Sequence, residues 1–218
     1  MKRNQYRLVV AFGLSVAPTT ILLLLLTRPH DSLARPGESM AATPGTGDPF
    51  PINAAPGSDQ FSPVVAHDER QNRHLVVYEN GAGMNAACLD AQGNTLASYV
   101  VPGSNGNAPD VVYSAYHDEY LIVFEDNSAI YGARVGGECS APPGGIGSAF
   151  EISDDRTNVG EYDPAVAYNR NASYQGYLVV WTDTNGSSPH FAIYARVVTG
   201  TGVIGSSFAI TDTSSAYN

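Results

Sequence analysis

Acidic side chains recur at one place in this sequence, directly after an apolar segment that begins with His or Tyr. They are Glu79, Glu125 with Asp126, and Asp183. Hard cations such as Ca²⁺ take roughly six to eight oxygen ligands, so these carboxylates predict a calcium site if the repeats bring them together; no other cofactor is expected. The competing interpretation is that hairpin turns need Asp and Asn there. The alternating Asp pattern of an EF-hand loop is missing.

A second set of polar residues ends the apolar segment that comes first in each repeat. His67, Tyr113 and Tyr168 occupy the same position, and Asp68 and Asp118 lie close by in the sequence. If these segments line a central channel, the five side chains form an asymmetric ligand-binding site at its mouth. The alternative is that the rings are buried between sheets, because an aromatic side chain buries a large apolar area.

Signatures of catalysis are weak in this sequence. It has no Gly-x-Ser-x-Gly elbow and no pair of histidines four residues apart, and His117 and His190 are predicted to be surface loop residues. The paired acids of a glycosidase come from distant strands and leave no local motif. An enzyme is therefore the less favoured interpretation.

The strands that must position these residues recur three times along the sequence. A Pro-led apolar strand is followed by a second strand rich in Leu and Val. The copies are Pro63-Val-Val-Ala-His67 with His74-Leu-Val-Val-Tyr-Glu79, Pro109-Asp-Val-Val-Tyr113 with Tyr120-Leu-Ile-Val-Phe-Glu-Asp126, and Pro164-Ala-Val-Ala-Tyr168 with Tyr177-Leu-Val-Val-Trp-Thr-Asp183. A third strand and an aromatic-x-aliphatic fourth strand complete each unit, as in Ile193-Tyr-Ala-Arg-Val-Val198 and Phe208-Ala-Ile210.

Four short strands in units of about 50 residues are typical of propeller blades. We therefore predict an all-β, propeller-like array of four-stranded antiparallel blades over residues 50–218, with blades at about 61–103, 107–153 and 162–212. Phe50-Pro-Ile52 matches a fourth strand without its preceding three, so it is predicted to act as an N-terminal latch strand. Three blades fall short of the roughly four to eight that close a ring. The array is expected to be part of a longer chain or to be completed by another chain.

The first 34 residues differ in kind. Lys2, Arg3 and Arg7 precede an apolar stretch from Leu8 to Leu26, and Ser32-Leu-Ala34 has the small residues of a cleavage site. This pattern predicts a secretory signal peptide, with an uncleaved signal anchor as the alternative because of its length. Residues 35–49 predict a flexible linker. The expected location is secreted, periplasmic or in the cell envelope.

The net charge restricts the classes of binding partner, and the two cysteines allow two predictions about a disulfide. A net charge of −10 without a basic stripe argues against nucleic acid, and membrane contact is expected through the N-terminal segment alone. Cys88 and Cys139 are predicted either to pair across neighbouring blades or to remain free thiols.

The third unit carries a resemblance to known proteins. Tyr177-Leu-Val-Val-Trp-Thr-Asp183, Ile193-Tyr-Ala-Arg196 and Gly205-Ser-Ser-Phe-Ala-Ile210 resemble the repeats of uncharacterised secreted bacterial proteins that look like β-propellers. The resemblance implies fold and compartment. We expect a non-catalytic binding or scaffold module for a glycan, a protein or a cation, and a homo-oligomer if the chain is complete. The alternatives are a polysaccharide hydrolase or lyase with carboxylates at the channel mouth, and a fragment of a longer multi-blade protein.

Overall fold

The computed structural model describes residues 49–52, 59–81, 83–103, 105–139, 146–153, 160–171, 173–184 and 191–211. All of them belong to one compact unit, Ala41–Asn218. The predicted signal segment, almost all of the linker and His190 lie outside the described residues. Within those residues, no helix is long and apolar enough to span a membrane.

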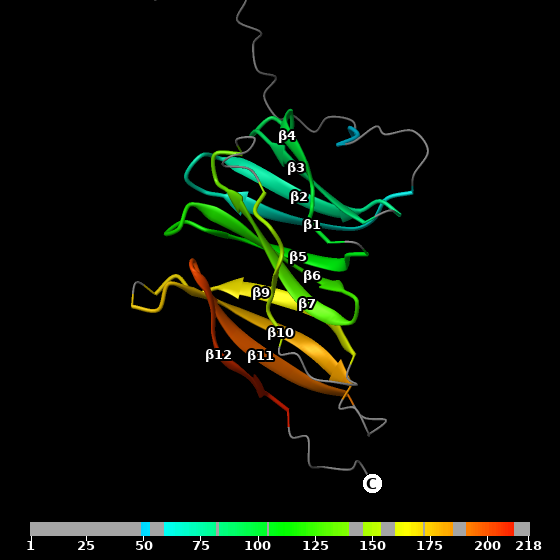
Figure 1. Cartoon of the computed structure of the whole chain (residues 1–218). Helices are drawn as coiled ribbons and strands as arrows, with labels where there is room; N and C mark the ends of the chain where they lie inside the picture. Colours follow the sequence, from blue (N-terminus) through cyan, green and yellow to red (C-terminus); the bar gives the residue numbers. More distant parts are fainter. Residues whose placement is uncertain are drawn as a thin grey trace, which may run out of the picture. The chain divides into compact units, whose positions relative to one another are not determined.

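The described residues form three four-stranded antiparallel sheets, which appear as successive layers in Figure 1. Sheet 1 contains β1 (Phe61–Asp68), β2 (Arg73–Glu79), β3 (Met84–Leu89) and β4 (Thr95–Val100). Sheet 2 contains β5 (Asn107–Ser114), β6 (Glu119–Asp126), β7 (Ala129–Gly136) and β8 (Phe150–Glu151). Sheet 3 contains β9 (Glu161–Tyr168), β10 (Gly176–Thr184), β11 (Phe191–Thr199) and β12 (Gly202–Ala209). The prediction of an all-β, propeller-like array of three four-stranded blades is confirmed.

The middle sheet is covered on both faces, which explains its unbroken apolar sequence. Because side chains alternate along a strand, Ile122 and Phe124 of β6 pack toward sheet 1 while Leu121 and Val123 pack toward sheet 3. All four side chains are fully buried. The two cores therefore lie between consecutive sheets, and the first strands β1, β5 and β9 run beside one another.

Each first strand carries a bulge directly before its proline. Ser62, Ala108 and Asp163 have φ values of 48°, 47° and 51°, and the pairing register of each strand shifts at this point. An extra residue in the left-handed region is typical of a β-bulge, and a proline is tolerated there because it cannot donate to the ladder. The repeated proline thus marks a bulge, and each strand begins before it.

The predicted latch segment lies on the outer face of sheet 1. Ile52 packs against Val76, Tyr78, Ala87 and Leu89. Among the described residues, 49–52 pair with no strand. The segment therefore lies against the outer face of sheet 1, where the fourth strand of a preceding sheet would pack.

A disulfide links the first two sheets. Cys88 in β3 and Cys139 after β7 are bonded, with their Cα atoms 6.0 Å apart. Both residues are buried in the core between sheets 1 and 2. The cross-link therefore supports the packing of the two sheets.

Candidate ligand-binding site

The three turns that join first and second strands lie beside one another. We call this surface the turn face; its described turn residues are 69–72, 115–118, 169–171 and 173–175. Arg70 Nη1 donates to the Ala115 carbonyl at 3.2 Å, and Arg170 pairs with Glu69 at 3.3 Å. The Arg170–Glu69 pair is largely exposed and contributes little stability. It does show that the first and third turns meet.

Three of the five predicted ligand residues come together on the turn face, between sheets 1 and 2. The buried Asp68 accepts backbone N–H groups of Arg70 and Gln71 through Oδ1, at 2.7 and 3.1 Å. The Tyr113 hydroxyl donates to Asp118 Oδ1 at 2.7 Å. Burial, with the nearby Asp118 and Asp68 carboxylates, raises the pKa of Tyr113 far above its usual range. The phenol therefore stays a protonated donor at all physiological pH values.

The other two predicted ligand residues lie elsewhere. His67 is exposed on the outer side of sheet 1, with its ring 4.8 Å from that of His74. Tyr168 belongs to the next interface, where its ring lies 5.3 Å from that of Tyr177. The repeat places His67, Tyr113 and Tyr168 at equivalent positions, but one sheet separates each side chain from the next.

Next to the turn face, a charged network joins sheets 2 and 3. Glu119 Oε1 accepts from Arg134 Nη1 at 2.9 Å and from the Tyr177 hydroxyl at 3.0 Å. Arg134 also donates to the Thr199 carbonyl, and its guanidinium lies 4.8 Å from the centre of the Phe150 ring. Burial and the Glu119 charge raise the pKa of Tyr177. These contacts join the ends of β6 and β7 to sheet 3.

A hollow of about 560 Å³ lies on sheet 1, and another of about 430 Å³ lies on the turn face. His117, Tyr174 and the β11–β12 turn from Thr199 to Gly202 line the second one. The His117 ring contacts Tyr116 edge-on at 4.9 Å and bonds to the Gln175 carbonyl at 2.9 Å. His117 thus lies in the turn between β5 and β6, and its partner Gln175 comes from the turn between β9 and β10.

Two exposed tyrosines belong to this part of the turn face: Tyr174 lines the hollow, and Tyr116 contacts the lining residue His117. Tyr116 is 61% and Tyr174 is 73% exposed. Neither tyrosine is among the predicted ligand residues, because those residues were chosen at the strand ends. A signal was present: Tyr116 precedes Tyr120, and Tyr174 precedes Tyr177, at nearly the same spacing.

The predicted metal ligands hold turns and bulges at the opposite strand ends. Glu79 accepts the bulge N–H of Ala108 at 3.0 Å, and Asp126 accepts the Asn105 N–H at 3.3 Å. Asp183 is buried. Across the described ranges, no three His, Cys, Asp or Glu side chains are arranged to hold a metal ion. The part of the chain that the structure describes thus offers no support for the calcium site.

Glu125 offers a test of the charge at these strand ends. Burial raises its pKa, and the Asp163 and Glu79 carboxylates raise it further. Since the folded state then holds the proton more tightly than the unfolded chain, stability is lost as pH rises through the folded pKa. Glu125→Gln is therefore expected to raise the melting temperature at pH 7 and to change nothing below about pH 4, where both states are protonated.

The check is a series of thermal melts from pH 3 to pH 8. Glu119→Gln serves as the control, because removing the partner of Arg134 should lower the melting temperature at pH 7. A Glu125→Gln variant less stable than the parent chain at pH 7 would contradict the assignment.

Comparison with known proteins gives likeness of structure alone. No protein-family model and no curated protein matches the chain. A GH43_12 protein retrieved from a capybara gut metagenome matches with a TM-score of 0.47 and 13% identity, over 68% of this chain and 30% of that one.

Two further solved structures are similar. One is an engineered GH43 glycoside hydrolase with endo-xylanase and exo-arabinofuranosidase activity (TM-score 0.43, 16% identity, 71% of this chain and 32% of that one). The other is an auxiliary nutrient binding protein from Bacteroides ovatus (TM-score 0.36, 13% identity, 67% and 35%). The chain spans about a third of the length of these proteins. At such scores the likeness assigns neither activity nor ligand.

Proposed function

We propose that this chain is a secreted, non-catalytic binding module that takes a glycan on its turn face. The observation that carries the proposal is the pair of exposed rings, Tyr116 and Tyr174, beside a hollow lined by His117. Large exposed aromatic side chains have an energetic cost in water, which a ligand that covers them would remove.

The chemistry of the hollow suits a polyhydroxylated ligand. Sugar rings present C–H faces that pack on aromatic rings, and hydroxyl groups that need hydrogen-bonding partners. Ligand sites combine apolar surface with a few placed polar groups. Here the polar groups are the His117 ring, the hydroxyl of Thr201 and the backbone of Gly200 and Gly202.

The test is a glycan array followed by calorimetric titration of the best ligand. Tyr116→Ala and Tyr174→Ala are each expected to weaken binding by about tenfold, the effect of losing one aromatic contact of ~1–1.5 kcal/mol. Phe191→Ala is the matched control, because Phe191 is 68% exposed and does not line the hollow. Unchanged affinity in both tyrosine variants would refute the turn face as the site.

A second candidate function is polysaccharide cleavage, and the Asp68–Tyr113–Asp118 cluster favours it. The Asp118 side chain is 33% exposed and lies 3.7 Å from Arg70, whereas Asp68 is buried. Two carboxylates in different environments are the usual requirement for acid–base cleavage of a glycosidic bond. Release of reducing ends from a bound glycan, abolished by Asp118→Asn, would replace binding with hydrolysis as the function.

A further inference from the structure

The repeat defines two kinds of sheet face. We call the face that a sheet turns toward the next sheet its forward face, and the opposite one its back face. In sheet 2, Leu121 and Val123 lie on the forward face, and Ile122 and Phe124 on the back face. Both chain interfaces join a forward face to a back face. Among the described residues, no further sheet packs on the forward face of sheet 3 or on the back face of sheet 1, where residues 50–52 lie.

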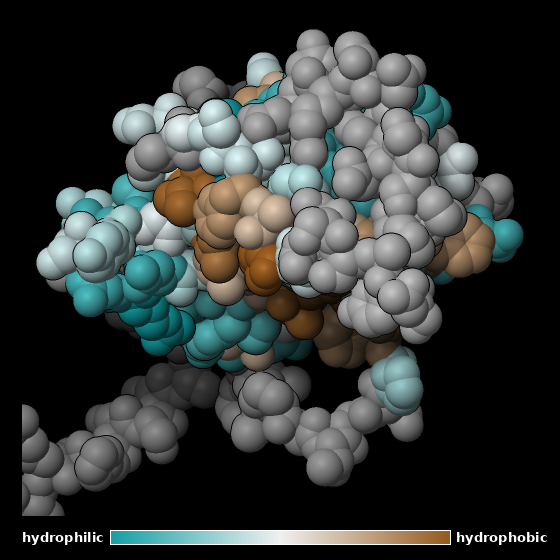
Figure 2. Space-filling model, turned by 90° about the horizontal axis from the view of Figure 1, so that it is seen from below, coloured by the Kyte–Doolittle hydropathy of each residue, from teal (hydrophilic) through white to brown (hydrophobic). Residues whose placement is uncertain are grey.

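Exposure at equivalent positions identifies the open forward face. Leu75, Leu121 and Leu178 occupy the same position in the three repeats, and they are 0%, 0% and 41% exposed. The same holds for the third residue of the fourth-strand motif, since Val101, Ile152 and Ile210 are 1%, 0% and 53% exposed. Figure 2 shows apolar side chains gathered on the side seen from below, where sheet 3 lies in Figure 1.

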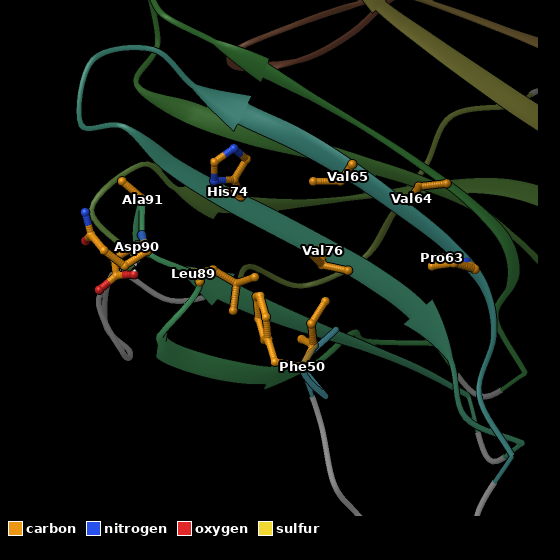
Figure 3. A pocket seen from close by; sticks show the side chains of 12 residues that line it. Phe50, Pro63, Val64, Val65, His74, Val76, Leu89, Asp90 and Ala91 are labelled. Atoms are coloured by element: carbon orange, nitrogen blue, oxygen red, sulfur yellow. Dashed lines mark hydrogen bonds between the residues drawn. The ribbon is translucent and has the colours of Figure 1, made fainter. Parts of the chain in front are cut away.

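The back face of sheet 1 is open in the same way. Val65 is 61% exposed, while its equivalent Val111 in sheet 2 is 7% exposed. The 560 Å³ hollow lies here, lined by Val65, Val76, Leu89 and Phe50. Figure 3 shows the Phe50 ring next to Leu89 at one side of this hollow.

We propose that a second copy of this chain covers these faces head to tail, the forward face of sheet 3 docking on the back face of sheet 1. The interface continues the pattern already built twice within the chain, and a second copy supplies both missing halves. Because the contact is heterologous, it forms a closed ring if the rotation fits. Two copies bring six blades, within the range of closed propellers.

The segment at residues 50–52 occupies the position on the back face of sheet 1 that the docking strand of the second copy would take. Phe50-Pro-Ile52 has the spacing of Phe208-Ala-Ile210. Ile52 packs on sheet 1 in a core with Val76 and Leu89, just as Ile152 of sheet 2 packs on sheet 3 with Val179 and Trp181. Ile210 of the second copy would enter the place of Ile52. The segment thus competes with the docking strand and limits association.

Few charged groups would meet in this docking, and Asp90 is the one acidic side chain that lines the hollow on the back face of sheet 1. The histidines His67 and His74 lie on the back face of sheet 1. Burial and the proximity of His67 lower the pKa of His74, which keeps that ring neutral at pH 7. On the forward face of sheet 3, the exposed side chains of β9 and β10 at the interface are Ala165, Ala167 and Leu178.

The test is light scattering of the full chain on a sizing column over a range of concentrations. We expect a mass of twice 23.0 kDa that falls to the monomer value on dilution. Leu178→Asp and Val65→Asp should each give monomers, because each removes one half of both contacts. A mixture of the two variants should associate again, since one keeps the back face and the other the forward face.

Two further variants complete the design. Val100→Glu is the control, because Val100 is 76% exposed and its equivalent in sheet 2 is Glu151; it should leave the mass unchanged. Ile52→Ser should strengthen association several-fold, because the small polar side chain no longer competes for the position that Ile210 of the second copy would take. A monomer at every concentration would overturn the proposal, as would a dimer that survives either Leu178→Asp or Val65→Asp, since that dimer would use like faces. Far-ultraviolet circular dichroism confirms that each variant is folded.

Discussion

Replacing Trp181 with alanine is expected to lower the free energy of unfolding by about 3–5 kcal/mol. Trp181 is 1% exposed and belongs to the core between sheets 2 and 3, together with Leu121, Val179 and Ile152. Truncation to alanine removes the largest fully buried side chain among the described residues and leaves a cavity that rigid strands cannot fill. Urea unfolding, followed by circular dichroism, measures the loss.

Two matched variants separate packing from other effects. The indole N–H of Trp181 is buried without a hydrogen-bonding partner among the described residues. Tyr78 and Phe124 hold the equivalent position in the other repeats, so Trp181→Phe should cost far less than Trp181→Ala. Val100→Ala, at an exposed site, should change stability by less than about 0.5 kcal/mol. A loss of the same small size for Trp181→Ala would show that the interface between sheets 2 and 3 is absent in solution.

Removing the disulfide is the second large effect. Cys88 and Cys139 are 51 residues apart, and closing a loop of that length stabilises a fold by about 4 kcal/mol in the chain-entropy treatment. The double variant Cys88→Ala/Cys139→Ala is expected to lose about 3–5 kcal/mol of unfolding free energy, since both residues are also buried.

The same unfolding experiment, with and without reductant, supplies the control. Reductant should destabilise the parent chain and leave the double variant unchanged. If the parent chain lost less than about 1 kcal/mol under full reduction, the two sheets would be held by their apolar core alone. Intact mass under native conditions, lower by two hydrogens than the fully reduced form, establishes the bond directly.

Only some of the predicted ligand residues meet in the structure. Asp68, Tyr113 and Asp118 are predicted to lie near one another because each is at or just after the end of a first strand, and the structure does bring them together. The repeat could not predict that His67 points to the outer side of sheet 1. Equivalent residues in successive blades face equivalent interfaces, so they do not converge on one point.

The sequence alone determined the strands, their grouping into fours and the approximate range of each blade. These features depend on alternation, turn residues and a repeat period, which act over a few residues. Tertiary structure decided which distant groups meet. His117 bonds to Gln175, 58 residues away, and Cys88 bonds to Cys139. It also decided which of three equivalent leucines is left exposed, because burial depends on the neighbouring sheet and leaves no mark in the repeat.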